Sequence, residues 1–496
     1  MVHKTILINE DDNEIRTAIL RNNLLTELAI ERKERKGIAG SIYKGKVKDI
    51  IPGMDAAFID IGWERTGFLY ISEVTAPPGV YEEIPQELLT EGERTTQTFR
   101  SPIERILKEG EDILVQVVRD PVGSKGPRLT TFITIPGKFL VLMPTINRLG
   151  ISKKISNLQE RKRIRGIFQK IKPRNSGLIL RTIGEGKDER LLTQDLNYLL
   201  KIWERITRSS KRRPTPSLLY EEPDLAIRTT RDIFNPDEDR LIIDDFKKYR
   251  ILKRLLMRYY RRPPSSLLLH SGNLPLFEEY NIEEQIGKAL RKKVWLASGG
   301  YITVEETEAL VSIDVNSGRF TGVEGLEDTA LKINLEAAKE ITRQVILRNL
   351  GGIIIIDFID MRKRENKQKL INTLRNAFKN DRAKTKINTV SSLGLVEMTR
   401  ERISPSLAQM LCESCPSCQG SGVITSVITA AINKEKEIRR LLKERKEKIV
   451  KLRLNPEVSQ YLKERKRDRL MERIFRKRVI LWDDENLGLE ELKIVT

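Results

Sequence analysis

The sequence predicts a multidomain protein of mixed fold class, with α+β and α/β parts, and three observations support this prediction. The chain has 496 residues, enough for roughly three or four domains of ~100–200 residues each. Its N-terminal part contains many short strands broken by polar turns. Residues 301–425 instead combine strands with a long helix, and hydrophobic residues make up 39% of the chain, enough to form buried cores.

The first part of the chain is predicted to be β structure. Three β-rich runs, KTILI, EIRTAIL and LLTELAIER, precede residue 37. Residues 40–73 alternate apolar and polar side chains with Gly or Pro at each turn, which indicates a small closed barrel. Residues 74–101 are rich in Pro, Thr and Glu without periodicity, so we expect an inserted loop there, with strands resuming at Asp112.

The middle of the chain mixes helices with short strands. We expect a basic helix at residues 153–170, a strand at 177–182 and a long helix after it. A link rich in Pro and Gly then leads to a helix at about 281–293.

Residues 301–360 show the order strand, helix, strand that is typical of an α/β domain. The segment YITVEETEALVSIDVNSG predicts a hairpin. The helix expected next has apolar residues at helical spacing, and Gly351 and Gly352 are expected to end it. The run IIIIDFID is continuously apolar, which predicts a buried strand in the centre of a sheet.

The charge balance points to a polyanionic partner. The net charge is +20, and nucleic acid is the commonest such partner, with an acidic membrane surface as the alternative. Residues 434–478 hold 19 basic and eight acidic residues, so a net charge of +11 lies in one stretch that is predicted to be helical. We expect this stretch to capture the polyanion or to pack subunits.

Scarce histidines and cysteines exclude several classes of site. With only His3 and His270, chemistry based on paired histidines is nearly excluded. All three cysteines lie between Cys412 and Cys418, so there is no disulfide framework and a reducing compartment is expected. No apolar run approaches the ~20 residues that span a bilayer, and the charged N-terminus resembles neither a signal nor a transit peptide. A cytoplasmic protein without a transmembrane segment is expected.

Two aspartates are candidates for a metal-dependent reaction. Asp314 lies near the end of the strand VSIDVNSG, and Asp357 follows four isoleucines, where a buried carboxylate is costly unless it is paired or bound to a metal. Aspartates on neighbouring strands can hold one Mg2+, which polarises a phosphodiester and activates water. Asn316 faces the same side as Asp314 and is expected to orient the phosphate or the water. Asp360 is a second candidate, and the simpler alternative is that these aspartates cap turns or pair with arginines.

The cysteines form half of a zinc-site pattern. Cys412, Cys415 and Cys418 are spaced C-x2-C-x2-C, and a Gly-Ser-Gly turn follows. Neither a fourth cysteine nor a nearby histidine completes four ligands, so two chains that each donate Cys415 and Cys418 are expected to share one Zn2+. A redox pair and cysteines without a ligand role are the alternatives, and Cys412 is left over.

Aromatic residues of the predicted barrel are candidates for stacking on bases. Phe58 and Phe68 lie at strand ends, and Lys125 lies in the loop GSKGP. Aromatic faces beside a lysine are typical of OB-fold barrels that bind single strands. The alternative, at least as well supported by the pattern alone, is that both phenylalanines belong to the core.

Seven segments, in order and over nearly the whole chain, resemble the ribonuclease E/G family of endoribonucleases. They are IYKGKVKDIIPGMDAAFIDIGWERTGFL, SKGPRLTTFITIPGKFLVLMP, GLILRT, ALVSIDVNSG, NLGGIIIIDFIDM, LGLVEMTRERISPSL and CPSCQGSG. The cysteine spacing suits the G branch of the family. The chain is therefore expected to match the catalytic region, without the degradosome scaffold tail of the E branch.

The resemblance implies that the chain is divided into six parts. They are a degenerate RNase H-like subdomain (1–38 and 226–288), an S1 (OB-fold) RNA-binding barrel (39–131), a 5′-sensor region (132–225), a DNase I-like catalytic subdomain (289–410), a zinc-link (411–422) and a basic helical small domain (423–496).

The resemblance also implies the metal sites. In the family, the residues that correspond to Asp314 and Asp357 bind the catalytic Mg2+, and the residue at Asn316 assists. The residues at Cys415 and Cys418 share a structural Zn2+ between protomers. A homodimer, or a dimer of such dimers, is therefore expected.

The RNA contacts implied by the resemblance lie in the barrel and in the 5′-sensor region. The matching positions are Phe58, Phe68 and Lys125 for single-stranded RNA, and Arg181, Thr182, Gly137 and Val141 for a 5′-monophosphate. An arginine fork suits a doubly charged terminal phosphate. Where the E branch has an additional pocket arginine in a DRAR segment, this chain has Lys384, and if that position belongs to the pocket the preference for a 5′-monophosphate is weaker.

The implied function is a Mg2+-dependent endoribonuclease of rRNA and tRNA processing and mRNA decay. It would cleave single-stranded RNA, leave 5′-phosphate and 3′-hydroxyl ends, and prefer 5′-monophosphorylated substrates. The main alternative is a non-catalytic S1-type RNA-binding or assembly protein. A membrane-surface protein that uses the basic C-terminal segment is a weaker alternative, because acidic residues are interspersed there.

Overall fold

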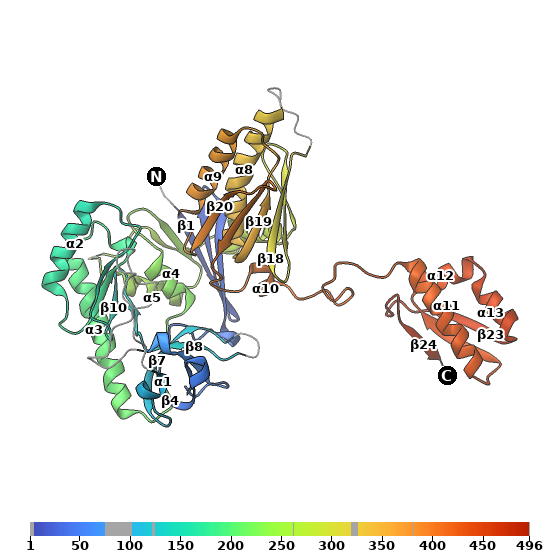
Figure 1. Cartoon of the computed structure of the whole chain (residues 1–496), viewed down its shortest axis with the longest axis horizontal. Coiled ribbons are helices and arrows are strands. Elements are labelled where there is room, and N and C mark those ends of the chain that lie inside the picture. The colour runs from blue at the N-terminus through green and yellow to red at the C-terminus, as the bar shows by residue number, and fades with distance from the viewer. Residues whose placement is uncertain are drawn as a thin grey trace. The chain divides into compact units, whose positions relative to one another are not determined.

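The computed structural model (Figure 1) describes residues 4–74, 102–121, 125–260, 262–318, 326–379 and 381–495. The chain divides into two compact units, Met1–Leu407 and Ala408–Thr496. The loop expected at residues 74–101 lies, apart from its first residue, outside the described residues. Among the helices of the described ranges, none has the length and apolar character needed to cross a membrane.

A five-stranded sheet joins the N-terminus to residues far along the chain. Its elements are β1 (Thr5–Glu10), β2 (Glu14–Arg21), β3 (Leu24–Arg32), β14 (Arg240–Ile243) and β15 (Leu267–Leu269), with helices α4 (Leu225–Asp232), α5 (Phe246–Leu256), α6 (Leu276–Glu279) and α7 (Ile282–Ala289). The strand order is β15-β14-β1-β2-β3, with β1 parallel to β14 and antiparallel to β2. The two segments assigned to one discontinuous subdomain therefore share a sheet, while its likeness to RNase H stays a prediction.

The second sheet closes into a barrel, as predicted. Its strands are β4 (Ile42–Ile51), β5 (Ala56–Asp60), β6 (Gly67–Tyr70), β7 (Asp112–Arg119) and β8 (Arg128–Thr130), with the short helix α1 (Ile103–Ile106) and an added strand β13 (Ser217–Tyr220). The order is β13-β4-β5-β6-β8-β7, and β7 pairs back onto β4. Val47, Ile59 and Leu129 are among its buried core residues. The closed five-stranded barrel is consistent with an S1-like domain.

The region that follows the barrel packs two helices on a small sheet. It consists of β9 (Ile135–Pro136), β10 (Leu140–Met143), β11 (Leu149–Ile151), β12 (Gly177–Leu180), α2 (Leu158–Ile171) and α3 (Glu189–Arg212). The strand order is β11-β12-β10-β9. The helix expected at 153–170 begins at Leu158, because the side chain of Asn157 accepts hydrogen bonds from two backbone N–H groups of its first turn. Phe139, Phe168 and Leu199 lie in the shared core.

A six-stranded sheet between residues 293 and 400 shows the predicted strand-helix-strand order. Its elements are β16 (Lys293–Trp295), β17 (Tyr301–Glu306), β18 (Leu310–Asn316), α8 (Leu326–Leu347), β19 (Gly352–Asp357), α9 (Arg364–Phe378), β20 (Thr385–Val390) and β21 (Leu395–Arg400). The order is β16-β17-β18-β19-β21-β20. β17 and β18 form the expected hairpin, and β18 and β19 are parallel on either side of α8 in the sequence. Figure 1 shows α8 and α9 packed together beside this sheet.

One expectation about this sheet is wrong. The run IIIIDFID forms a central strand, but the strand is buried on one face only. Ile354 and Ile356 are fully buried, whereas Ile353 is 51% exposed and Asp357 is exposed. The reason is the two-residue period of a strand, which turns alternate isoleucines toward the helices and the others toward an open face.

Two helix boundaries also differ from the predictions. The helix expected at 281–293 ends at Ala289, and residues 293–295 form the edge strand β16. Helix α8 ends at Leu347, and Asn349 adopts a left-handed conformation (φ 51°) before the glycine pair is reached.

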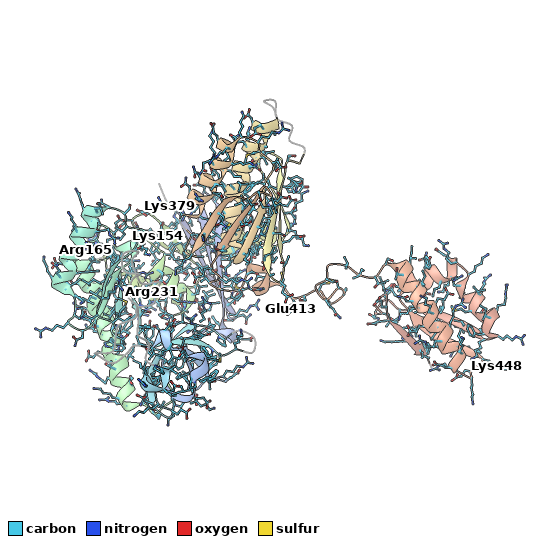
Figure 2. The ribbon with its side chains drawn as sticks, in the orientation of Figure 1. Lys154, Arg165, Arg231, Lys379, Glu413 and Lys448 are labelled. Carbon is cyan, nitrogen blue, oxygen red and sulfur yellow. The ribbon has the colours of Figure 1, made fainter. Side chains whose placement is uncertain are left out.

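The C-terminal unit corrects the prediction of a helical small domain, because it contains a sheet as well. Helix α10 (Leu407–Leu411) begins at the last residue of the first unit, and the elements that follow are α11 (Val427–Glu444), β22 (Ile449–Leu454), α12 (Pro456–Glu464), α13 (Arg467–Phe475), β23 (Arg478–Asp483) and β24 (Leu492–Val495). The strand order is β23-β22-β24. In β22, buried Val450 and Leu452 alternate with Lys451 and Arg453. The high density of basic residues, Lys448 among them (Figure 2), concealed this two-residue alternation in the sequence.

Candidate active site

The two candidate aspartates lie opposite each other on adjacent parallel strands. Asp314 of β18 is the direct register partner of Asp357 of β19. Their neighbours Ile313 and Ile356 are buried, whereas both aspartates are exposed, so both carboxylates emerge on the open face of the six-stranded sheet. Neighbouring strands lie about 4.8 Å apart, which places the two carboxylates within reach of a shared ligand.

Asn316 completes this group. Its Nδ2 donates a hydrogen bond to Oδ2 of Asp314 at 2.5 Å, which holds the carboxylate in one orientation. Asp360 lies in the loop after β19, beside Gly394, and is not the register partner of Asp314. The structure therefore brings together Asp314, Asn316 and Asp357 and leaves Asp360 outside the group.

The donor set fits a hard cation such as Mg2+. Two carboxylates and an amide offer oxygen ligands, and Mg2+ usually binds one or two carboxylates and keeps several waters. Within the described ranges, the hydrogen-bond partner of Asp314 is Asn316, and neither Asp314 nor Asp357 forms an ion pair with an arginine or lysine. The described part of the chain has no group of three or more His, Cys, Asp or Glu side chains placed to hold a metal, so water or substrate would complete the coordination.

The barrel aromatics form a row at the surface. Phe58 lies opposite Phe68 with ring centroids 5.3 Å apart, and the rings of Phe68 and Tyr70 are 4.4 Å apart. Both phenylalanines are half-buried rather than core residues, and Lys125 is exposed. The sequence analysis missed Tyr70 and also Arg128, whose guanidinium lies 5.4 Å from the Tyr70 ring. The alternation in GFLY, which puts Phe68 and Tyr70 on one face, was the available signal.

Arg181 and Gly137 of the predicted 5′-phosphate pocket are in direct contact. Arg181, directly after β12, donates from Nη1 to the carbonyl oxygen of Gly137 at 2.5 Å and to Oδ1 of Asp232 at 2.6 Å. Thr182 is exposed and its hydroxyl shares a 2.9 Å hydrogen bond with that of Ser152, and Val141 lies on β10, the strand that pairs with β12. Arg181 is thus already held by a carboxylate, which an incoming phosphate would have to share or displace.

The charged side chains next to Arg181 form ion pairs with one another. Arg231 (Figure 2) bonds to Asp232 at 2.8 Å and to Glu222 at 2.7 Å. Burial raises the pKa of Asp232, but the hydrogen bond from Arg231 and the charge of Arg181 outweigh it and hold that pKa below its usual value. Burial, with the nearby charge of Arg181, lowers the pKa of the Lys138 ammonium to about 7.

The cysteines form a turn with two thiols of suitable spacing for a metal. Cys412, Cys415 and Cys418 are all free thiols. Backbone N–H groups of Cys418 and then Ser417 point at Cys415 and lower its thiol pKa, which favours the thiolate form that binds metals. Among the described residues, no group of three or more His, Cys, Asp or Glu side chains is placed to hold a metal, so Cys415 and Cys418 alone would leave a structural Zn2+ two ligands short of four.

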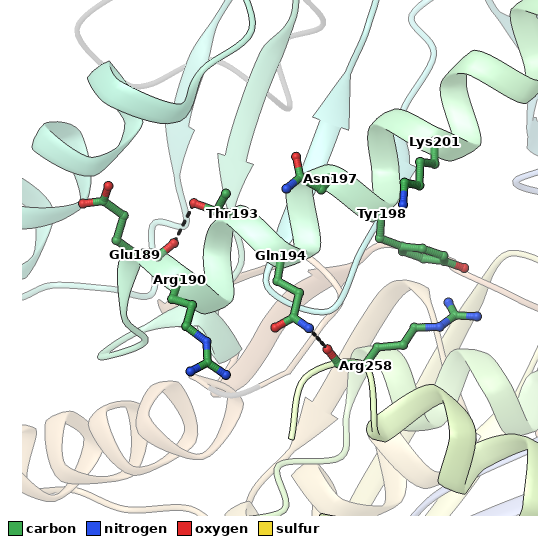
Figure 3. A pocket seen from close by; sticks show the side chains of 8 residues that line it. All are labelled: Glu189, Arg190, Thr193, Gln194, Asn197, Tyr198, Lys201 and Arg258. Carbon is green, nitrogen blue, oxygen red and sulfur yellow. Dashed lines mark hydrogen bonds between the residues drawn. The ribbon is translucent and has the colours of Figure 1, made fainter. Parts of the chain in front are cut away.

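A further pocket of about 790 Å³ lies along α3 (Figure 3) and was not predicted. The Gln194 side chain donates to the carbonyl oxygen of Arg258, and the Arg258 guanidinium lies 4.3 Å from the centre of the Tyr198 ring. Its lining comes from α3 and from Arg258, too far apart in sequence to be grouped by a motif. The lining residues are Glu189, Arg190, Thr193, Gln194, Asn197, Tyr198, Lys201 and Arg258.

Two family models match the chain. The ribonuclease E/G family model covers residues 134–403, and a model described as the thioredoxin-like domain of RNase E/G covers residues 414–496. The second match agrees with the mixed sheet and helices of the C-terminal unit.

Named relatives resemble the chain over most of its length. Ribonuclease G of Escherichia coli K12 is 39% identical over 436 residues, which are 88% of this chain and 87% of that protein. Ribonuclease G of Haemophilus influenzae is 39% identical over 457 residues, 92% of this chain and 91% of that protein. Ribonuclease E of Escherichia coli K12 is 39% identical over 425 residues, 85% of this chain but 39% of that protein. This chain therefore belongs to the ribonuclease E/G family.

Proposed function

We propose that this chain is a Mg2+-dependent endoribonuclease that hydrolyses single-stranded RNA. The observation that carries the proposal is the register pairing of Asp314 with Asp357 on the open face of the six-stranded sheet of residues 293–400, with Asn316 bonded to Asp314. We name this sheet after the proposed site and call it the catalytic sheet. The matched family region includes all three residues, and the named relatives are ribonucleases.

The chemistry follows from the donor groups of this site. Asp314 and Asp357 would hold Mg2+, which when bound polarises the phosphodiester and activates a water. Asn316 holds the Asp314 carboxylate through one hydrogen bond, and the carboxylate lone pairs outside this bond face the open side of the sheet. Attack by water on phosphorus with departure of the 3′ oxygen, which takes up a proton, leaves a 5′-phosphate and a 3′-hydroxyl. His270, the one histidine among the described residues, is hydrogen-bonded to the Leu274 carbonyl and is not part of this group.

The same proposal assigns the RNA contacts. The aromatic row of the barrel, with Phe58 and Phe68, would stack on bases, and Lys125 would meet phosphate. Arg181 and Thr182 would bind a 5′-monophosphate, which suits roles in rRNA and tRNA processing and mRNA decay. If Lys384 occupies the position of the additional pocket arginine of the E branch, it would weaken this preference.

The decisive experiment is a cleavage assay on a 5′-monophosphorylated single-stranded oligomer, with and without Mg2+, in which the product ends are mapped. We expect Mg2+-dependent products with 5′-phosphate and 3′-hydroxyl ends. Asp314→Asn should lower the rate about a thousandfold or more, because it removes a charged ligand, and should leave RNA binding unchanged. Binding without any Mg2+-dependent product in the unaltered protein would instead support the non-catalytic RNA-binding alternative.

We also propose that Cys415 and Cys418 share a Zn2+ with the same pair of a second copy, which makes a homodimer. Zinc removal, or the double change Cys415→Ser with Cys418→Ser, should convert dimers to monomers in light scattering. Cys412→Ser is the matched control and should leave the mass unchanged. A dimer that persists after complete zinc removal would contradict the zinc-link.

A further inference from the structure

Two aromatic rings and a lysine form an exposed cluster at the edge of the catalytic sheet. Trp295 of the edge strand β16 is 62% exposed and lies opposite Tyr301 of β17, with ring centroids 5.3 Å apart. The ammonium nitrogen of Lys293 lies 4.2 Å from the centre of the Trp295 ring and 3.5 Å from that of Tyr301. We call Lys293, Trp295 and Tyr301 the edge cluster.

The edge cluster is continuous with the candidate active site. Tyr301 lies directly opposite Asn316, which is hydrogen-bonded to Asp314. Ile302, the next residue along β17, is fully buried. Because successive side chains of a strand point to opposite faces, Tyr301 emerges on the same open face as the aspartates. Trp295, Tyr301 and Asn316 thus form one row across three neighbouring strands, spaced about 4.8 Å apart. A polymer bound at the aspartates must pass over or beside this row.

The chemistry of the edge cluster suits one nucleotide of single-stranded RNA. Every base presents a π face to an aromatic ring, and an exposed tryptophan offers a large one. The Lys293 ammonium, held over the rings, brings a positive charge to the place where the adjacent phosphate would lie. The net charge of +20 favours a polyanion as the occupant.

We propose that the edge cluster is a base-stacking subsite of the cleavage site. Trp295, supported by Tyr301, stacks on a base of a nucleotide that flanks the scissile phosphate, and Lys293 pairs with a neighbouring phosphate. This inference rests on the proposed function, because it takes the substrate to be single-stranded RNA. The subsite positions the strand over Asp314 and Asp357 without taking part in the chemistry.

The test compares a series of 5′-monophosphorylated RNA oligomers that each carry one abasic nucleotide, placed at successive positions across the cleavage site. Binding is measured by fluorescence anisotropy with the full-length Asp314→Asn protein, which is expected to bind the RNA without cleaving it. One position should weaken binding by roughly 5- to 100-fold, the range for a lost stacking contact. Adding Trp295→Leu should weaken binding of the intact oligomer by a similar factor and remove the effect of that one abasic position.

Two further variants distinguish stacking from a folding defect. Trp295→Phe should restore most of the position dependence, because it keeps an aromatic face. Trp482→Leu, which removes another exposed tryptophan, in the C-terminal unit, should leave the abasic profile unchanged. In the Mg2+-dependent assay of the otherwise unaltered protein, Trp295→Leu should raise KM far more than it lowers kcat.

The outcomes separate this inference from the proposed function. An abasic profile that is the same with and without Trp295 would overturn the subsite. If Trp295→Leu changes the mass of the protein assembly but leaves RNA binding unchanged, the subsite is also overturned. The edge cluster would then be a contact between copies of the chain. Failure of the unaltered protein to cleave the intact oligomer would overturn the proposed function, whereas the binding profile still decides the subsite.

Discussion

The closed barrel and the catalytic sheet both place side chains opposite one another across strands, but they expose different groups. In the barrel, β7 pairs back onto β4, and the facing pair is Phe58 and Phe68, both half-buried. In the catalytic sheet, α8 and α9 pack together, and the facing pair is Asp314 and Asp357, both exposed on the other face.

Under the proposed function, this difference assigns stacking in the barrel and chemistry at the aspartates to different side chains of one chain. Aromatic rings stack on bases but hold no metal, whereas paired carboxylates hold a cation and contribute little apolar contact. Changes in the barrel should therefore alter affinity, and changes at the aspartates should alter the rate of the chemical step. The predictions below test that division.

The largest effect is expected at Asp357. Asp357→Asn removes one charged ligand from the shared site, so kcat should fall about a thousandfold or more while the Kd for RNA stays unchanged. Asp360→Asn, three residues further along, is the matched control and should change kcat little, because Asp360 is outside the register pair. Initial rates at saturating oligomer give kcat. An equal loss in both variants would show that the register pairing does not define the site.

Part of the active site could be predicted from the sequence. The order of hairpin, helix and apolar strand implied that Asp314 and Asp357 come from adjacent strands, and the structure pairs them directly. The open face could not be predicted, because four consecutive isoleucines conceal the two-residue period that exposes Ile353 and Asp357. Trp295 was missed because no strand was predicted between the helix expected at about 281–293 and Tyr301, and the pairing of Trp295 with Tyr301 becomes apparent only from the register.

The catalytic sheet and the barrel also differ in how deeply each buries an ion pair, and this difference should affect stability. Arg400 of β21 and Asp381, which lies between α9 and β20, form a bidentate ion pair with side chains only 3% and 2% exposed. Arg400→Met should lower the free energy of unfolding by about 3–5 kcal/mol, because it leaves a buried carboxylate without its partner. In the barrel, the Arg128–Glu73 pair is partly exposed, and Arg128→Met should cost about 1 kcal/mol or less.

Urea unfolding of both single variants measures this difference. The double variant Arg400→Met with Asp381→Leu should recover much of the lost stability, because no unpaired charge stays buried. Equal losses from Arg400→Met and Arg128→Met would show that burial does not distinguish the two ion pairs.

A smaller effect than at Asp357 or Arg400 is expected in the barrel, where it tests the division most directly. Phe68→Leu keeps apolar volume but removes the face that would stack on a base, so the Kd for single-stranded RNA should rise roughly 5- to 100-fold. The value of kcat at saturating RNA should not change, since the aspartates are untouched. Trp63→Leu, which alters an exposed aromatic outside the Phe58–Phe68–Tyr70 row, is the matched control and should bind RNA normally. A lower kcat with unchanged Kd in Phe68→Leu would mean that the barrel contributes to the chemical step, and the separation of binding from chemistry would then fail.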